Sequence, residues 1–256
     1  NNNHGQIYSG RALEFDGVGD YLNAGSASSL DNIWINGGTV AVWIYCEDNT
    51  PSTDMEIFYK GAGTGPSEGW SFHLQTNGKL RFTVDTTGAT DGNFVTSEIL
   101  EADTWYRVVV AYNLGSSVSS MSGEAADIYI NGIKSTLTTS TALVADYDSD
   151  ETRDLVLGVG TTNHDDRFFK GMMCDAQIWD TKWTQSDVTF DYLNPESLAL
   201  NNSGTSLTES NLKLWYPMQD GHRGQQSYVL DGAGTGLGDN LVTNPTCDAN
   251  LSSSST

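Results

Sequence analysis

The feature that most constrains the fold of this chain is a recurring alternation of apolar residues with a period of two. In the stretch 39–46, Val40, Val42, Ile44 and Cys46 fall on one side of an extended chain, because successive residues of a strand point to opposite faces. The residues between them are also largely apolar, so we expect this strand to be covered on both faces. The pattern recurs along the chain and predicts strands rather than helices.

Turn and helix signals complete the fold prediction. Asn77-Gly78 and Asn131-Gly132 each follow an alternating run, and Asn-Gly favours the tight turn of a β-hairpin because both of its residues accept positive φ. A capping box that begins at Thr184 predicts one short helix, which Asn194-Pro195 ends. Roughly ten short strands and one short helix predict an all-β fold, a two-sheet antiparallel jelly-roll sandwich.

Charge excludes two classes of partner. The 256 residues contain 12 Lys and Arg against 33 Asp and Glu, a formal net charge of −21. A nucleic-acid-binding protein needs a basic surface, and anionic lipid would repel this chain. No apolar run approaches the ~20 residues of a membrane helix. We therefore expect neither nucleic-acid binding nor membrane insertion.

The composition changes after Pro195. From there Asn, Ser, Thr and Gly dominate, apart from an apolar cluster at residues 212–218, and the chain ends in a serine-rich segment. We therefore divide the chain into a jelly-roll domain, residues 1–195, and a linker with an extended tail, residues 196–256, that leads toward a further module.

Several sequence blocks resemble laminin-G-like domains of the concanavalin A-like lectin/glucanase superfamily. The blocks stand in the order that this family shows: Gly10–Gly17 with Asp20-Tyr21-Leu22, then Thr39–Ile44, Ile57–Gly61, Thr104–Tyr112, Asp127–Gly132 and Phe169–Trp179. The resemblance covers roughly residues 5–195 and implies the same two-sheet sandwich. It does not specify function, because the fold hosts lectins, enzymes and structural modules.

The tail carries a second resemblance. Residues 214–221 look like the first strand that normally precedes these domains, so that strand is either cut away here or supplied by the tail. Residues 239–244 are similar to module junctions in bacteriophage virion and fibre proteins. This resemblance implies a location on a virion surface or in an extracellular fibre.

Catalytic motifs are missing from the sequence. Glucanases of the superfamily place three carboxylates along one strand, so that two can flank a glycosidic bond. Glu101-Ala102-Asp103 comes nearest, but Trp105 and Tyr106 stand where the third carboxylate belongs. We therefore expect a protein that is not an enzyme.

Calcium is the cofactor that the resemblance implies, as one structural ion between the first-strand loop and the closing strand. Asp16 and Asp20 flank a glycine turn, and Asp175 alternates away from apolar neighbours, so these three carboxylates are the predicted ligands. The alternative is that they are turn-forming and solvated carboxylates.

Sugar binding requires an exposed aromatic platform with polar groups beside it. The candidates are Trp70, Tyr147, Asn163, His164, Asp165 and Arg167. The alternatives are that Trp70 packs at the start of a strand and that residues 163–167 form a polar hairpin tip.

Two functions follow from these expectations. The first is a non-catalytic carbohydrate-binding or adhesion module of a phage virion or extracellular fibre protein that contacts host-surface glycans. The second is a purely structural decoration or fibre module without its own glycan ligand. The expected partners are a cell-surface glycan and other virion or fibre subunits, and a homo-oligomer is an open alternative.

Overall fold

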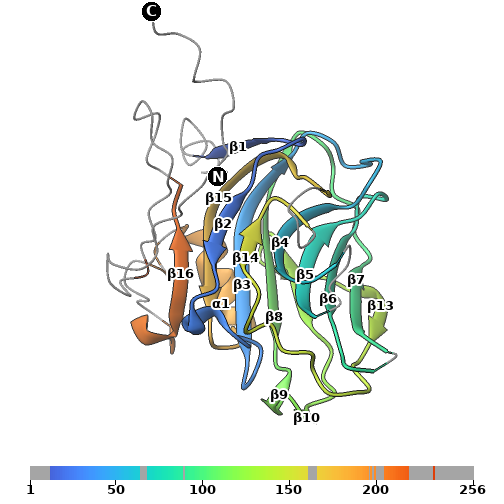
Figure 1. Ribbon diagram of the computed structural model, residues 1–256. Coiled ribbons are helices and arrows are strands. Elements are labelled where there is room, and N and C mark those ends of the chain that lie inside the picture. The colour runs from blue at the N-terminus through green and yellow to red at the C-terminus, as the bar shows by residue number, and fades with distance from the viewer. Residues whose placement is uncertain are drawn as a thin grey trace, which may run out of the picture.

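In the computed structural model, two antiparallel sheets of seven strands each pack face to face (Figure 1). The structure describes residues 12–63, 68–88, 90–160, 166–195 and 205–218, together with the single positions 197, 199 and 233. Within these residues the predicted two-sheet antiparallel sandwich is confirmed, including its one short α-helix. Sheet A consists, in spatial order, of β1 (Leu13–Asp16), β15 (Lys170–Trp179), β3 (Gly38–Cys46), β8 (Thr104–Tyr112), β11 (Asp127–Ile130) and β12 (Ile133–Lys134), with β16 (Leu212–Tyr216) also on β15.

Sheet B forms the second layer, and most of its strands lie at the right of Figure 1. The remaining short elements are the β9–β10 ribbon (Gly115–Ser117 and Ser120–Met121) and two 3₁₀ turns, Ser28–Leu30 and Glu209–Asn211. The order of sheet B is β13 (Leu137–Thr141), β7 (Gly92–Thr96), β6 (Leu80–Val84), β5 (Gly69–Leu74), β4 (Met55–Gly61), β14 (Leu155–Leu157) and β2 (Leu22–Gly25).

The main core lies between the sheets and consists of the alternating residues that the sequence pattern indicated. Val40, Val42 and Ile44 of β3 are fully buried there, against aromatic side chains of sheet B. Trp34 packs edge-on against Trp70, with ring centroids 5.1 Å apart. Burying each such side chain stabilises the fold by about 1.5–3 kcal/mol.

Helix α1 (Gln185–Leu193) covers the outer face of sheet A. Its capping box is formed as predicted, because the Thr184 backbone N–H donates to Asp187 Oδ2 at 2.8 Å and the Asp187 N–H donates to Thr184 Oγ1 at 3.3 Å. Val188 joins a second buried cluster with Val109 and Trp179 on this face. The helix explains why β3 is buried on both faces.

The two Asn-Gly turns differ in detail. Asn131 and Gly132 have φ of 51° and 80°, as the predicted tight turn requires. At the other turn only Gly78 has a positive φ, 78°, and its N–H donates to the Gln75 carbonyl. Asn77 there adopts an ordinary negative φ, so this hairpin uses a turn of another type than the one predicted.

The tail contributes a strand to the sandwich. β16 pairs antiparallel with β15, with Ala176 opposite Tyr216 and Ile178 opposite Leu214. β1 occupies the other part of the same edge, with Leu13 opposite Met173. The sequence left open whether the first strand is cut away or supplied by the tail. The structure shows that the tail supplies it, as β16. The continuation toward a further module lies outside the described residues.

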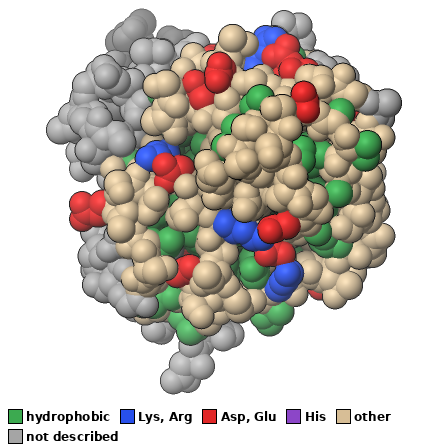
Figure 2. All heavy atoms as spheres, turned by 90° about the horizontal axis from the view of Figure 1, so that it is seen from below, with side chains coloured by type: hydrophobic (Ala, Val, Ile, Leu, Met, Phe, Trp, Pro, Cys, Tyr) green, Lys and Arg blue, Asp and Glu red, His purple; other side chains and the backbone are tan. Residues whose placement is uncertain are grey.

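The surface is mixed in character. Figure 2 shows one face, on which acidic side chains lie beside basic ones and hydrophobic side chains form small patches. None of the helices in the described part of the chain is long and apolar enough to cross a bilayer.

Candidate functional site

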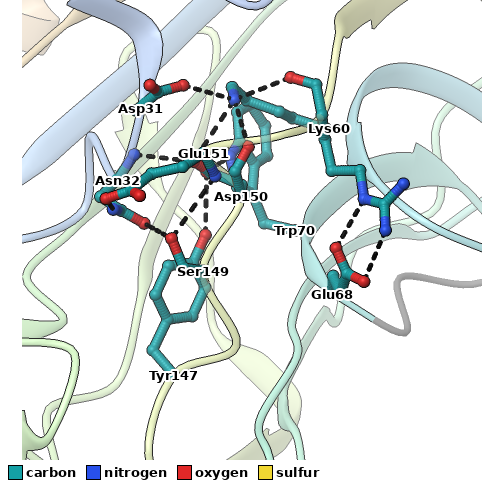
Figure 3. A network of polar contacts seen from close by, with 10 residues as sticks. Asp31, Asn32, Lys60, Glu68, Trp70, Tyr147, Ser149, Asp150 and Glu151 are labelled. Atoms are coloured by element: carbon teal, nitrogen blue, oxygen red, sulfur yellow. Dashed lines mark hydrogen bonds and ion pairs between the residues drawn. The ribbon is translucent and has the colours of Figure 1, made fainter. Parts of the chain in front are cut away.

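Trp70 and Tyr147, predicted as an exposed aromatic platform, are buried instead. Their exposed fractions are 0% and 2%. The Trp70 indole N–H donates to Asp150 Oδ2 at 3.0 Å and the Tyr147 hydroxyl donates to the same oxygen at 2.9 Å (Figure 3). Each ring therefore packs in the core with its polar atom satisfied by one buried carboxylate. The prediction that these two rings are exposed is wrong. For Trp70 the alternative holds, that it packs in the core at the start of a strand.

The same carboxylate belongs to a closed polar network around Lys60. Lys60 Nζ lies 2.9 Å from Asp31 Oδ1 and 3.4 Å from Asp150 Oδ1, and it donates to the carbonyls of Asp150 and Arg153. Asp150 Oδ1 also accepts from the Asn32 N–H at 2.7 Å. Figure 3 shows these groups converging from separate segments of the chain. Because each buried charge has partners, the network is structural rather than a ligand site.

The predicted calcium corner is not assembled. Asp16 pairs with Lys170, five residues along β15 from Asp175, which corresponds to roughly 16 Å along a strand. Asp16 Oδ1 accepts the backbone N–H groups of Val18 and Gly19, and Asp20 Oδ2 accepts the N–H of Asp16. These hydrogen bonds are those of a turn. Burial raises the pKa of Asp16, but the backbone N–H groups together outweigh it and lower the pKa below its ordinary value.

Asp175 serves a different purpose from the predicted one. It is 1% exposed and its Oδ1 accepts from the Trp215 indole N–H at 2.8 Å, while Oδ2 lies 3.3 Å from Arg107. Asp175 points away from the main core, as expected, but the Trp215 and Arg107 side chains enclose it there. The expected corner of Asp175 with Asp16 and Asp20 is therefore wrong. Within the described ranges, no three His, Cys, Asp or Glu side chains converge closely enough to hold a metal ion.

A polar row that the sequence analysis did not single out crosses the outer face of sheet B. Glu56 of β4 is paired in register with His73 of β5, and His73 is paired with Arg81 of β6. Their neighbours in sequence, such as Phe72 and Phe82, point into the core, so the alternating polar residues lie on the opposite face. We define the Glu56–His73 site as this row with its adjoining groups, Asp54, Glu56, Ser71, His73, Arg81 and Arg167.

The centre of this site is buried and incompletely paired. Glu56 is 0% and His73 2% exposed. His73 Nδ1 lies 3.2 Å from Ser71 Oγ and 3.6 Å from Glu56 Oε2, and Nε2 lies 3.5 Å from Asp54 Oδ2. Glu56 Oε2 and His73 Nε2 have no hydrogen-bond partner among the described residues. Unpartnered buried polar atoms are rare in native proteins, and each calls for a partner such as a ligand or a water molecule.

Two partly exposed, charged side chains, Arg167 and Arg81, form the rim of the site. Arg167 Nη1 lies 3.2 Å from Glu56 Oε1, and the Glu56 N–H donates to the Arg167 carbonyl at 3.0 Å. On the other side, Arg81 Nε donates to Asn93 Oδ1 at 2.9 Å. Arg167 is thus the one predicted ligand-binding residue that the structure places at this site. Asn163, His164 and Asp165 lie outside the described residues.

Burial sets the protonation states of the central pair. It raises the pKa of Glu56 to about 8, although Arg167 opposes this effect. Burial also lowers the pKa of His73, and together with the positive charges of Arg81 and Arg167 it brings this pKa to about 3. At neutral pH the pair is therefore a carboxylic acid beside a neutral imidazole. Such a pair offers both donors and acceptors to a ligand.

This arrangement suits recognition better than glycoside hydrolysis. An inverting glycosidase needs room for a water molecule between two carboxyl groups. Here the His73 ring lies between the Asp54 and Glu56 carboxyl groups, within 3.6 Å of both. Donors and acceptors at fixed positions on a sheet face are what a ligand rich in hydroxyl groups requires.

The central pair gives the protein a testable pH dependence. The folded-state pKa of Glu56 lies above its ordinary 4.5, so its stabilising contribution is complete at low pH and is lost as pH rises through about 8. The pKa of His73 is lowered from 6.5, so its contribution is complete above that pH and is lost on acidification. Above pH 6.5, Glu56 is therefore the member of the pair that titrates.

We expect the Glu56→Gln variant to lack the loss of stability that ionisation of Glu56 causes as pH rises. Between pH 6.5 and 8, wild-type protein should lose roughly 2 kcal/mol of unfolding free energy more than the variant does. Urea titrations of both proteins at each pH measure the difference, and groups that titrate in both proteins cancel. Parallel pH profiles for the two proteins would contradict the assignment of this proton to Glu56.

The fold is a concanavalin A-like sandwich, and the family comparison agrees. Residues 16–189 match the family Laminin_G_3, described as the concanavalin A-like lectin/glucanases superfamily. The match extends over more than half of the chain, so the chain belongs to this family. The family description includes glucanases, and membership alone does not decide between binding and catalysis. No curated protein sequence matches the chain.

Solved structures with the same fold include binding proteins. A protein from Bacteroides ovatus, provisionally named a carbohydrate-binding protein, aligns with a TM-score of 0.59 at 16% identity over 87% of this chain and 55% of its own. The receptor binding domain of botulinum neurotoxin mosaic serotype C/D aligns with a TM-score of 0.55 at 14% identity over 75% of this chain and 44% of its own. The chain thus spans about half the length of these structures, and identities this low show the fold alone.

Sequence reasoning missed Glu56, His73 and Arg81 although a signal was present. His73 stands between Phe72 and Leu74, and Arg81 has apolar neighbours on both sides. The predicted two-residue turn at Asn77-Gly78 would have set His73 opposite Phe82. In the structure the register differs by one residue, and His73 lies opposite Arg81. Metal and catalytic motifs are recognised by fixed spacings along the sequence. Residues that become neighbours through strand pairing have no fixed spacing, so no motif indicates this row.

Proposed function

We propose that the protein is a non-catalytic carbohydrate-binding module that holds its ligand at the Glu56–His73 site. The observation that carries this proposal is the pair of unpartnered buried atoms, Glu56 Oε2 and His73 Nε2, at the centre of a polar row. Membership in a lectin-like family supports it. So does the fold shared with a protein named for carbohydrate binding.

In this proposal the buried and the exposed groups have separate roles. Arg81 and Arg167, which are partly exposed, make the first contacts with hydroxyl oxygens of the ligand. Glu56 and His73, both uncharged at neutral pH, form the buried centre of the site. They complete their hydrogen bonds with the ligand or with water that the ligand retains. A charged donor such as Arg81 is worth about 1.5–3 kcal/mol when it is well paired.

We further propose that the module works outside the cell, on a virion surface or an extracellular fibre, where it contacts host-surface glycans. The resemblance of residues 239–244 to phage module junctions supports this location. Other virion or fibre subunits are the proposed partners. Monomeric affinity in the millimolar to micromolar range, multiplied by many copies or by a homo-oligomer, would be sufficient for attachment.

Glycan-array binding of the whole chain tests the proposal. The Arg81→Ala variant should bind the captured glycans about tenfold to a hundredfold more weakly, because it loses a charged donor at the rim. The Lys134→Ala variant is the matched control, since Lys134 is an exposed cation at the edge of sheet A. It should bind like the wild type.

Further outcomes distinguish the other hypotheses. Calcium remains a proposed structural cofactor, and arrays with calcium and with EDTA test whether binding depends on it. Equal binding by Arg81→Ala and wild type would contradict the site. Release of reducing sugar from the bound glycan would contradict the non-catalytic assignment. An empty array, combined with loss of particle assembly when the segment is deleted, would favour the purely structural module.

A further inference from the structure

A second group of side chains lies on the outer face of sheet A, beyond the end of α1. Register across the sheet places Trp105 of β8 opposite Tyr45 of β3, Tyr45 opposite Met172 of β15, and Met172 opposite Glu14 of β1. None of these four side chains is buried. The helix covers this face of β3 as far as Trp43, on which Tyr192 stacks with centroids 5.7 Å apart, and Tyr45 is the next residue on the same face.

Tyr45 and Trp105 form an aromatic pair whose geometry is held in place. Their ring centroids lie 5.5 Å apart, with the ring planes at 49° to each other. The Tyr45 hydroxyl donates to Asp103 Oδ1 at 3.0 Å. Asp103 is itself fixed, because its N–H donates to the Cys46 carbonyl at 2.8 Å and its φ is 55°. Asp and Asn tolerate this left-handed conformation better than most residues.

The surroundings of the pair are acidic. Glu14, Glu47 and Asp103 are all exposed. The hydrogen bond to Asp103 raises the pKa of Tyr45, partial desolvation adds to this, and the charges of Asp103 and Glu47 raise it further. Lys170 is the nearby basic group in the described part of the chain, and it lies 3.4 Å from Glu47. The aromatic rings therefore stand in a negative field.

We propose that the Tyr45–Trp105 pair binds an organic cation of the alkylammonium class. A cation within about 6 Å of an aromatic centroid is attracted to the face of the ring. Because the two centroids are only 5.5 Å apart, one ammonium group can satisfy this distance for both rings. Asp103 and Glu47 add charge complementarity, from which a neutral sugar on the same rings would gain nothing. This site is separate from the Glu56–His73 site and does not rest on the proposed function.

Calorimetric titration of the whole chain with choline, at low ionic strength, tests the proposal. The expected result is millimolar binding that weakens as salt is added. The neutral isostere 3,3-dimethyl-1-butanol has the same shape without the charge, so it should bind much more weakly. The Trp105→Leu variant should lose roughly tenfold in affinity, whereas Trp105→Phe should retain part of it.

Two charge variants complete the test. Asp103→Asn keeps the left-handed backbone position and removes the charge, so choline affinity should fall. Lys170→Gln removes the competing cation beside Glu47, so affinity should rise. Melting curves of each variant confirm that it is folded. Three outcomes would each overturn the proposal. Choline and its neutral isostere could bind equally well, or Trp105→Leu could leave the choline affinity unchanged. The third is tight binding of methyl glucoside that Trp105→Leu abolishes.

Discussion

Truncation of the chain after residue 204 is expected to unfold the protein at room temperature. The truncation removes β16, whose side chains Leu212, Leu214 and Tyr216 are at most 4% exposed, and Trp215 at 8%. At about 1.5–3 kcal/mol for each buried side chain, the upper estimate of the loss is roughly 6–12 kcal/mol. Most domains have only about 5–15 kcal/mol of stability in total. Loss of the cooperative thermal transition in calorimetry is the result to look for.

Two controls separate the strand from the rest of the tail. Truncation after residue 218 keeps β16 and its pairing with β15, so this shorter chain should melt close to the full-length protein. Lys213→Ala changes a partly exposed residue of the same strand, which pairs with Asp180 at 2.8 Å, and should cost at most about 1 kcal/mol. If the chain that ends at residue 204 melts cooperatively near the full-length temperature, β16 is not part of the stable sandwich.

The fold was predictable from sequence because its signals are local. Alternation fixes which residues of a strand face the core, and the capping box at Thr184 fixes where the helix begins. The pairing of β16 with β15 was not predictable in the same way. It joins segments that are far apart in the chain, and the sequence favoured equally a strand at the edge of this domain and the start of another module.

The site was less predictable because burial decides what a polar or aromatic residue does. Trp70 has the same local appearance as a surface platform, and only the position of Asp150 shows that its N–H is satisfied inside. Asp175 was placed on the outer face of its strand correctly, but that face is covered. Residues that look alike in sequence therefore separate into structural and candidate binding groups only after the layers are assembled.

The second large effect is expected from Arg107→Met. Arg107 is buried under α1, where its Nε and Nη2 donate to Asp191 at 2.7 and 3.0 Å and its Nη2 lies 3.3 Å from Asp175 Oδ2. Methionine fills similar space but leaves two buried carboxylates without their cation. Removing one partner of a buried ion pair costs about 3–5 kcal/mol. Urea titration should show a loss of that size at pH 8.

The loss should also shrink on acidification. Burial raises the pKa of Asp175 to about 6 even though Arg107 lowers it, so without Arg107 the pKa of this carboxyl should rise further. A carboxyl whose folded-state pKa is raised stabilises the fold at low pH and loses that contribution as pH increases. The difference between Arg107→Met and wild type should therefore be smaller at pH 5 than at pH 8.

A second substitution tests whether stranded charge is the cause. Adding Asp191→Leu to Arg107→Met removes one of the two unpaired carboxylates, so the double variant should be more stable than Arg107→Met alone. A purely steric effect of losing the guanidinium predicts the opposite, since the double variant would then lose further packing under α1. A double variant that is less stable than Arg107→Met at pH 8 would show that shape, rather than charge, holds the helix on sheet A.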